Sequence, residues 1–216
     1  MLNALIVYGG WPGHQPEQGA KKVEEILGQD GFDTHITQDY RALGSDQLDE
    51  LDLVVPIITS DEIEKAQIER LSLAVRNGLG LASYHGGLAT SFRNIVQFHY
   101  LVGVQWVAHP GDIVRYRVDV TRPDDPVMQG ISSFDYVSEQ YYLHYDPSIE
   151  ILATTTFTGE HDPVTAGVVM PVVFKRRFGA GRVFYSALGH VAAEFDNAEM
   201  RTILRRGLNW AAREKA

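Results

Sequence analysis

The chain of 216 residues contains no cysteine. This absence excludes disulfide bonds, thiolate metal sites and a thiol nucleophile at the same time. A chain without cysteine is compatible with the cytoplasm, which is the location we expect. Polar chemistry must therefore come from other side chains, and the eight histidines are prominent among them.

Positive charge and long apolar runs are also scarce. The 28 acidic residues outnumber the 19 lysines and arginines, which leaves a formal net charge of −9 and no long basic run. This balance argues against nucleic acid or an anionic membrane surface as a partner. No stretch approaches the roughly 18 to 20 consecutive apolar residues of a membrane span. Residues 1–8 lack the basic region and cleavage site of a signal peptide and are expected to form the first strand.

A dinucleotide-binding fingerprint is missing as well. Residues 9–13 read Gly-Gly-Trp-Pro-Gly, without the G-x-G-x-x-G spacing and with a proline inside the loop. The chain also shows no internal repeat, low-complexity tract or linker, so we expect a single domain over residues 1–216.

Short apolar runs alternate with helical segments through the first half of the chain. The expected order is strand 2–8, helix 17–29, strand 32–37, short helix 45–50, strand 51–58, helix 60–76 and strand 79–83. Thr59 or Ser60 is expected to cap the helix at 60–76. This order predicts an α/β fold with a doubly wound, mostly parallel sheet and helices on both faces. Ligands of such sheets bind beyond the carboxyl ends of the strands.

The second half predicts additional strands. Residues 113–120 alternate apolar and charged side chains, which is typical of a half-exposed strand that could pair across a homo-oligomer. Further strands are expected at 150–156, 168–176 and 182–188, with helices at 94–101 and 197–212 and a turn-rich segment at 103–111. The aromatic stretch 134–146 is dense in titratable groups.

The most informative local signal is the stretch Leu79–Phe92. A short apolar run stops at Ser83-Tyr84-His85-Gly86-Gly87, and helix-compatible residues follow. A strand that turns sharply into a helix holds the residue at the bend above the carboxyl edge of the sheet, often in strained geometry. Hydrolases carry a serine or cysteine at such a bend, whereas this chain carries His85.

Five short motifs then follow one another along the chain. They are Tyr84-His85-Gly86-Gly87, Leu101-Val-Gly103 leading to Ala108-His109-Pro110, Ser138-Glu139-Gln-Tyr141, Pro171-Val172-Val173, and the run from Gly181-Arg182 to Gly189-His190. Their order resembles that of the ThuA-like proteins, which are named for trehalose utilisation and resemble class I glutamine amidotransferases in fold. The resemblance covers nearly the whole chain and implies a flavodoxin-like sheet with additional antiparallel strands in the second half.

The resemblance also implies roles for particular residues. His85 takes the place of the amidotransferase cysteine, and His190 follows the last core strand, where those enzymes carry the triad histidine. Glu194 lies near the position of the third triad member. Glutaminase activity is not expected, because that reaction proceeds through a thioester and the chain has no cysteine.

The remaining polar residues support proton transfer, since imidazole titrates near neutral pH and a neighbouring carboxylate can orient it. We expect His85, His190 and Glu139 to be catalytic, and His14, Trp11, Tyr84, His109 and Tyr141 to bind substrate. Trp106 and Tyr142 could add aromatic walls. The same loops could hold a divalent metal ion as cofactor, with His14, His85, His109 and His190 as candidate ligands.

The resemblance implies an enzyme of carbohydrate metabolism, a hydrolase, lyase or isomerase acting on a sugar or keto-glycoside. The alternative is a non-catalytic module that binds a small sugar-like molecule. Structural interpretations also stay open: His85 could simply fill the bend, His109 could belong to a turn, and Glu139 could be a solvated carboxylate.

Overall fold

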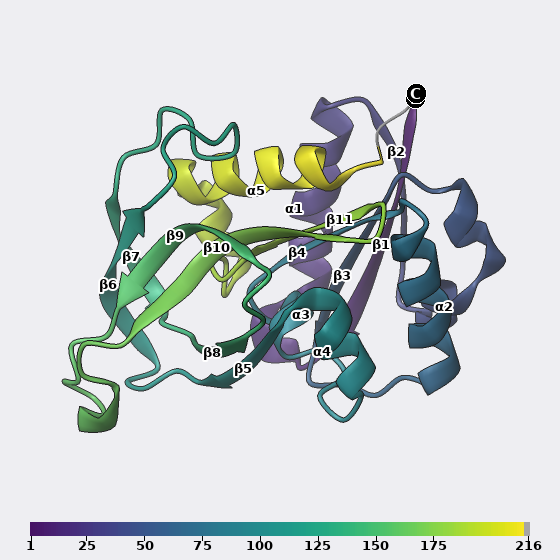
Figure 1. Cartoon of the computed structure of the whole chain (residues 1–216). Helices are drawn as coiled ribbons and strands as arrows, with labels where there is room; N and C mark the ends of the chain where they lie inside the picture. Colours follow the sequence, from purple (N-terminus) through teal and green to yellow (C-terminus); the bar gives the residue numbers. More distant parts are fainter. Residues whose placement is uncertain (214–216) are drawn as a thin grey trace.

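The computed structural model describes residues 1–213. Its centre is a nine-stranded mixed sheet in the order β2-β1-β3-β4-β11-β10-β9-β6-β7, and a separate two-stranded sheet pairs β5 with β8 (Figure 1). Neighbouring strands are parallel in the part β2-β1-β3-β4-β11 of the sheet. They are antiparallel in the part β11-β10-β9-β6-β7. The predicted α/β fold, with parallel strands first and antiparallel strands later, is confirmed.

The parallel half follows from continuous apolar runs. Its strands are β1 (Leu2–Gly10), β2 (Phe32–Thr37), β3 (Leu53–Thr59), β4 (Gly80–Tyr84) and β11 (Gly181–Ser186). Every residue of β3 and β4 is buried, as expected of central strands covered on both faces. The chain reverses direction across the sheet between β1 and β3, which is the topological switch point where ligands of this architecture bind.

The antiparallel half comprises β10 (Val169–Phe178), β9 (Glu150–Thr156), β6 (Ile113–Val120) and β7 (Phe134–Glu139). Segment 113–120 pairs with β7 over most of its length, so the outermost strand at this end of the sheet is β7. The expected turn-rich segment 103–111 is instead largely strand β5 (Val104–Ala108), paired with β8 (Tyr142–Tyr145). Its partner lies far along the chain, so no local pattern revealed it.

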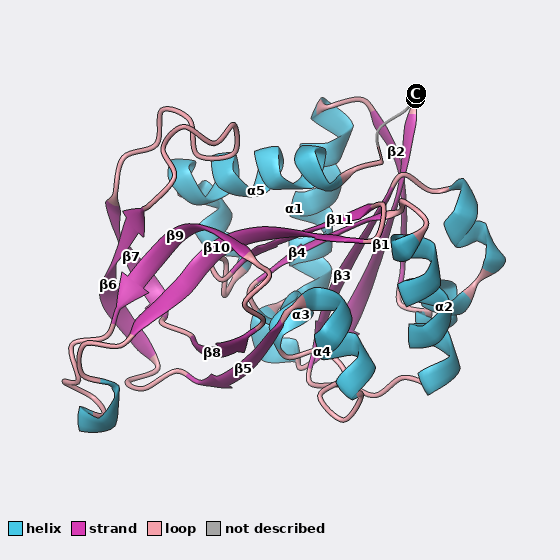
Figure 2. Ribbon diagram, in the orientation of Figure 1, coloured by secondary structure: helices cyan, strands magenta, loops and turns pink. Residues whose placement is uncertain are grey.

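Helices cover both faces of the parallel half, as Figure 2 shows. Helices α1 (Pro16–Gln29) and α5 (Ala198–Ala211) lie together on one face, and α2 (Lys65–Arg76), α3 (Gly86–Ala89) and α4 (Val96–Val102) lie on the other. The expected start of α2 at Ser60 is wrong. Ser60 has a positive φ of 52°, and Glu64 forms the capping box with Gln67 instead.

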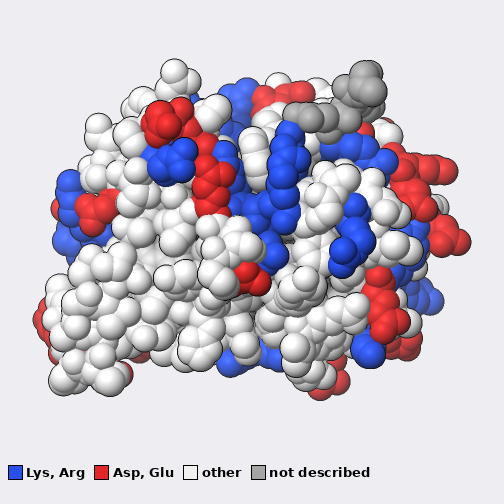
Figure 3. Space-filling view, in the orientation of Figure 1, with Lys and Arg blue, Asp and Glu red and all other residues white. Residues whose placement is uncertain are grey.

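Charged side chains of both signs alternate over much of the face shown in Figure 3, while its lower left part has few of them. Within residues 1–213, no helix is both long enough and apolar enough to cross a bilayer. The buried core extends through the sheet into both helical layers, so the strand ends that carry the polar loops rest on a packed support.

Candidate functional site

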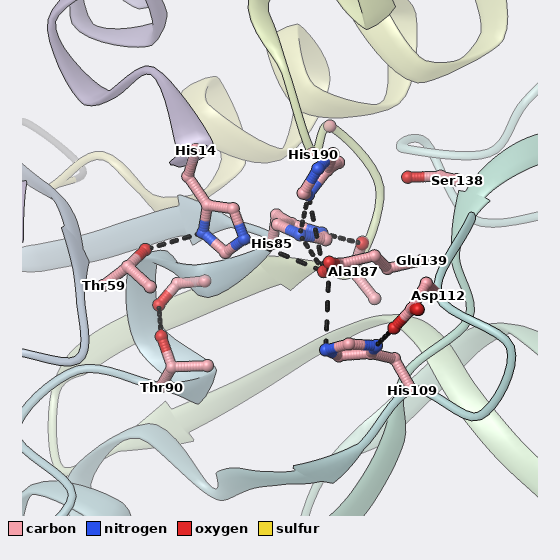
Figure 4. A network of polar contacts seen from close by, with 12 residues as sticks. His14, Thr59, His85, Thr90, His109, Asp112, Ser138, Glu139, Ala187 and His190 are labelled. Atoms are coloured by element: carbon pink, nitrogen blue, oxygen red, sulfur yellow. Dashed lines mark hydrogen bonds and ion pairs between the residues drawn. The ribbon is translucent and has the colours of Figure 1, made fainter. Parts of the chain in front are cut away.

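The site lies where several strands and loops end over one edge of the sheet. Strand β1 leads into the 3₁₀ helix η1 (Pro12–His14), β3 ends at Thr59, β4 leads to His85, and β11 leads to His190. Glu139 closes β7 and reaches the same place from the antiparallel half. Figure 4 shows these side chains pointing toward one another from separate elements.

His85 occupies the sharp turn that the sequence predicted. Its φ of 48° and ψ of −122° lie outside the usual regions for a side chain with a Cβ, and it directly precedes α3. The turn is held because the His85 N–H donates to the Ser186 carbonyl at 2.6 Å and the Tyr185 hydroxyl donates to the His85 carbonyl at 2.7 Å. Gly86 is required next to it, since a Cβ there would collide with Thr59 and His14.

The imidazole of His85 is 1% exposed, and both of its ring nitrogens lie beside oxygen atoms. Its Nδ1 lies 3.0 Å from the Ala187 carbonyl oxygen. Its Nε2 lies 3.0 Å from Oε2 of Glu139. Both oxygens only accept, so a neutral ring can donate to one of them but not to both. Burial lowers the pKa of His85 to about 4, so the ring is neutral at pH 7.

Glu139 is the centre of the cluster. Its Oε2 lies 3.0 Å from Nε2 of His85, 3.4 Å from Nδ1 of His190 and 3.7 Å from Nε2 of His14, while Oε1 lies 3.8 Å from Nε2 of His109. Burial acts to raise the pKa of Glu139, but the contacts with His14, His190 and His85 outweigh it and hold this pKa well below the usual range. The group is therefore a carboxylate at neutral pH.

Glu194 positions the loop that carries His190. Its Oε2 accepts the backbone N–H groups of Gly189 at 3.2 Å and His190 at 3.0 Å, and the Tyr136 hydroxyl at 2.6 Å. Its Oε1 accepts the Ser138 hydroxyl at 3.0 Å. Glu194 therefore does not act as the third member of a triad would, because it binds the backbone N–H of His190 and not its imidazole.

His14 and His109 approach different oxygens of Glu139. His14 places Nδ1 at 2.8 Å from the Thr59 hydroxyl, which leaves Nε2 toward the carboxylate. His109 follows β5, and its Nδ1 lies 3.3 Å from a carboxylate oxygen of Asp112. His14, His85, His190 and Glu139 each offer one ligand atom within 4.8 Å of the others and could hold a metal ion. His109, an expected candidate, is outside this group.

A cavity of about 450 Å³ opens over the cluster. Its aromatic lining is formed by Trp11, Trp106 and Tyr141, and His14, His109, His190 and Glu139 reach it. Burial, followed by the nearby Tyr185 and Glu139, raises the pKa of Tyr141 well above its usual value. The cavity also has the volume usual for small-molecule sites.

Tyr84 and Tyr142 do not reach this cavity. Successive residues of a strand face opposite sides, so Tyr84 points away from His85 and packs on Phe195 at 5.2 Å between ring centroids. Tyr142 packs on Phe157 at 5.7 Å. The placement of Tyr84 corrects the expectation that it lines the substrate site, and the period-two alternation of the strand could have revealed it.

A family model described as trehalose utilisation matches residues 3–211. The chain belongs to the ThuA family. Among solved structures, a ThuA-like protein from Bacteroides uniformis is similar at 19% identity and a TM-score of 0.79, with 97% of this chain and 91% of that chain covered. A ThuA-like protein from Parabacteroides merdae is similar at 20% identity and a TM-score of 0.79, with 100% of this chain and 92% of that chain covered. A cytoplasmic protein of Salmonella typhimurium matches at 17% identity, with 99% and 100% coverage and a TM-score of 0.66. No curated protein shows significant similarity to the chain.

In this ThuA-family chain, sequence reasoning missed several residues of the cavity. Thr59, Ser60 and Thr90 contribute hydroxyl groups, and Asp112 and Ile113 also line the cavity. Ser60 and Asp112 have positive φ values of 52° and 55°, which is rare for residues with a Cβ. Nothing in their local sequence distinguishes them from ordinary loop residues.

Proposed function

We propose that this ThuA-family chain is an enzyme of carbohydrate metabolism that moves protons on a sugar or an oxidised sugar such as a keto-glycoside. The observation that carries the proposal is the convergence of four imidazoles on the Glu139 carboxylate at the floor of an aromatic cavity. A carboxylate beside imidazoles can orient them and stabilise their protonated form during proton transfer.

The histidines differ in solvent exposure, and we assign their roles accordingly. His85 is buried, and both of its ring nitrogens are engaged within the protein, so we assign it a positioning role. The His109 side chain is 28% exposed, and its Nδ1 lies 3.3 Å from Oδ1 of Asp112 without forming a hydrogen bond to it. We therefore assign proton exchange with the substrate to His109, with Glu139 beside it to orient the ring and His190 completing the floor.

The cavity suits a polyol. Apolar faces of Trp11, Trp106 and Tyr141 can pack on the C–H groups of a sugar ring, and Thr59, Ser60 and Thr90 offer hydroxyl groups. The indole Nε1 of Trp106 is buried and has no hydrogen-bond partner among the described residues. Buried donors are normally satisfied, so the lack of a partner for this group is unusual.

A turnover assay tests the proposal. The purified chain is incubated with a panel of keto-glycosides and the parent glycosides, and product is followed by mass spectrometry. We expect turnover of at least one member and a loss of about 10²- to 10⁴-fold in kcat/KM for Glu139→Gln. The exposed Glu160→Gln serves as the matched control and should keep full activity.

The outcomes separate the proposal from its alternative. Sugar binding by calorimetry without turnover of any substrate would contradict the enzyme and identify a binding module. Turnover that survives Glu139→Gln would remove the carboxylate from the mechanism. We also propose a cytoplasmic location, which is supported by the name of the similar Salmonella protein.

A further inference from the structure

The geometry points to a divalent transition-metal ion bound by His14, His85, His190 and Glu139. The ligand atoms are Nε2 of His14, Nε2 of His85, Nδ1 of His190 and Oε2 of Glu139. Only the role of the ion rests on the proposed function, because its presence follows from the spacing and orientation of these four groups.

The spacing matches a coordination sphere. Zinc binds imidazole nitrogens and carboxylate oxygens at about 2.0 to 2.2 Å, so two neighbouring ligands of a tetrahedral site lie about 3.4 Å apart. In this structure, Nε2 of His85 lies 3.0 Å from Oε2 of Glu139 and 3.1 Å from Nδ1 of His190. Oε2 of Glu139 lies 3.4 Å from Nδ1 of His190 and 3.7 Å from Nε2 of His14. His85, His190 and Glu139 thus already have the spacing of a coordination sphere, and all four ligand atoms lie within 4.8 Å of one another.

His85 and His14 each use Nδ1 for a contact outside the cluster, with Ala187 and Thr59, and each directs Nε2 toward Glu139. Nδ1 of His85 lies 3.0 Å from the Ala187 carbonyl and Nε2 lies 3.0 Å from an acceptor oxygen of Glu139, and a neutral ring cannot donate to both. With the proton on Nδ1, the lone pair of Nε2 points toward Glu139 and can bind an ion placed between them. Thr59 can accept from Nδ1 of His14 in the same manner, which leaves Nε2 of His14 as an acceptor too. Metal-binding histidines characteristically donate their second ring nitrogen in this way.

A shared proton explains the convergence of these four groups less completely than a bound cation does. One proton placed between His85 and Glu139 would satisfy that contact alone, whereas His190 and His14 converge on the same carboxylate oxygen. One cation at the centre satisfies all four inward groups together. Three imidazoles and a carboxylate are a donor set suited to zinc, manganese or iron.

His109 lies outside the proposed centre. Its Nε2 is 3.8 Å from the other oxygen of Glu139, Oε1, and its Nδ1 faces Asp112. His109 is therefore free for proton exchange with a substrate. An ion held by the other four groups would have to accept a fifth ligand in order to polarise a sugar oxygen as a Lewis acid. This division makes His109 the matched control for metal binding, since it has the same side chain and adjoins the same carboxylate.

Metal titration of the chelator-treated full chain tests the inference. Cobalt(II) is followed by its visible absorption and zinc(II) by calorimetry, and circular dichroism checks the fold of every variant. We expect one ion per chain and a loss of about 100-fold or more in affinity for His14→Ala and His190→Ala, since each removes a ligand. Thr59→Val should weaken binding about tenfold through His14, and His109→Ala should change it by less than about threefold.

Two results would overturn the metal centre: no stoichiometric binding of cobalt or zinc, or binding that His14→Ala and His190→Ala leave intact. Its failure and that of the proposed function are distinguishable. Keto-glycoside turnover by a chain that binds no metal would contradict the metal centre and support the proposed enzyme. One bound ion without turnover of any substrate would support the metal centre and contradict the proposed enzyme.

Discussion

Nε2 of His85 lies 3.0 Å from Oε2 of Glu139, although 54 residues separate the two in the chain. The contact joins the parallel half of the sheet, through the turn after β4, to the antiparallel half, through the end of β7. Neither half contains the site alone. The site therefore depends on how the two halves are packed, and residues that fix this packing should affect activity without touching a substrate.

Glu194 is such a positioning residue. Glu194→Ala removes the acceptor for the backbone of Gly189 and His190, so the His190 loop should shift and kcat/KM should fall about 100-fold. Glu194→Gln can keep one oxygen toward these N–H groups and should restore most of the activity. Ser138→Ala, which removes a contact of the other oxygen only, should stay within about threefold.

The readouts for Glu194 are kcat, KM and the pH profile of each variant. A merely structural role would lower the amount of folded protein and leave these parameters unchanged per active molecule. Equal parameters for Glu194→Ala and the unmodified chain would contradict the positioning role.

Trp11 should contribute to substrate affinity. Its side chain is half exposed at the cavity entrance and packs edge-on to His14, with 4.8 Å between ring centroids. Trp11→Ala removes an aromatic face worth about 1.4 kcal/mol, so KM should rise about tenfold with a smaller change in kcat. Trp11→Phe should recover part of this loss. Tyr100 is an exposed aromatic residue outside the cavity, so Tyr100→Ala provides the control. If Trp11→Ala and Tyr100→Ala have the same KM, Trp11 does not belong to the binding site.

Two helical glycines should respond oppositely to alanine. Gly207 lies in α5 against β11, where a Cβ would overlap the Phe184 ring, so Gly207→Ala should destabilise the fold by about 1 to 3 kcal/mol. Gly28 lies in α1 with open space around it, and Gly28→Ala should stabilise the fold by about 0.5 to 1 kcal/mol. Urea unfolding measures both. Equal and small effects would show that α5 can move away from the sheet.

His85 should make the stability of the chelator-treated protein depend on pH. Burial lowers its pKa from 6.5 to about 4, so between these values the unfolded chain binds a proton that the folded chain does not. The contribution is fully present above pH 6.5 and is lost as the pH falls toward 4, by about 3 kcal/mol at 1.36 kcal/mol per pKa unit. The free energy of unfolding across this range measures it. His85→Asn should remove this part of the slope, and an unchanged slope would place the titrating group elsewhere.

Much of the fold follows from local patterns. The alternation of apolar runs with helical periods predicted the parallel half, and the small residues after β4 predicted the strained turn at His85, because both signals involve residues close together in the chain. The local pattern starts the helix at 60–76 too early, since Ser60 has a typical capping side chain but a left-handed backbone. Strand β5 was missed because its partner, β8, begins 34 residues after β5 ends.

The sequence by itself determined the chemical inventory of the site: histidines and one carboxylate at strand ends, and no thiol. The tertiary structure decided which of these groups meet. It placed His14, His85 and His190 on one oxygen of Glu139, left His109 with Asp112, and turned Tyr84 to the opposite side of the sheet. The physical reason is that hydrogen bonds and proton positions depend on differences of a few tenths of an ångström between distant segments. Only the packed sheet and its helices set those distances.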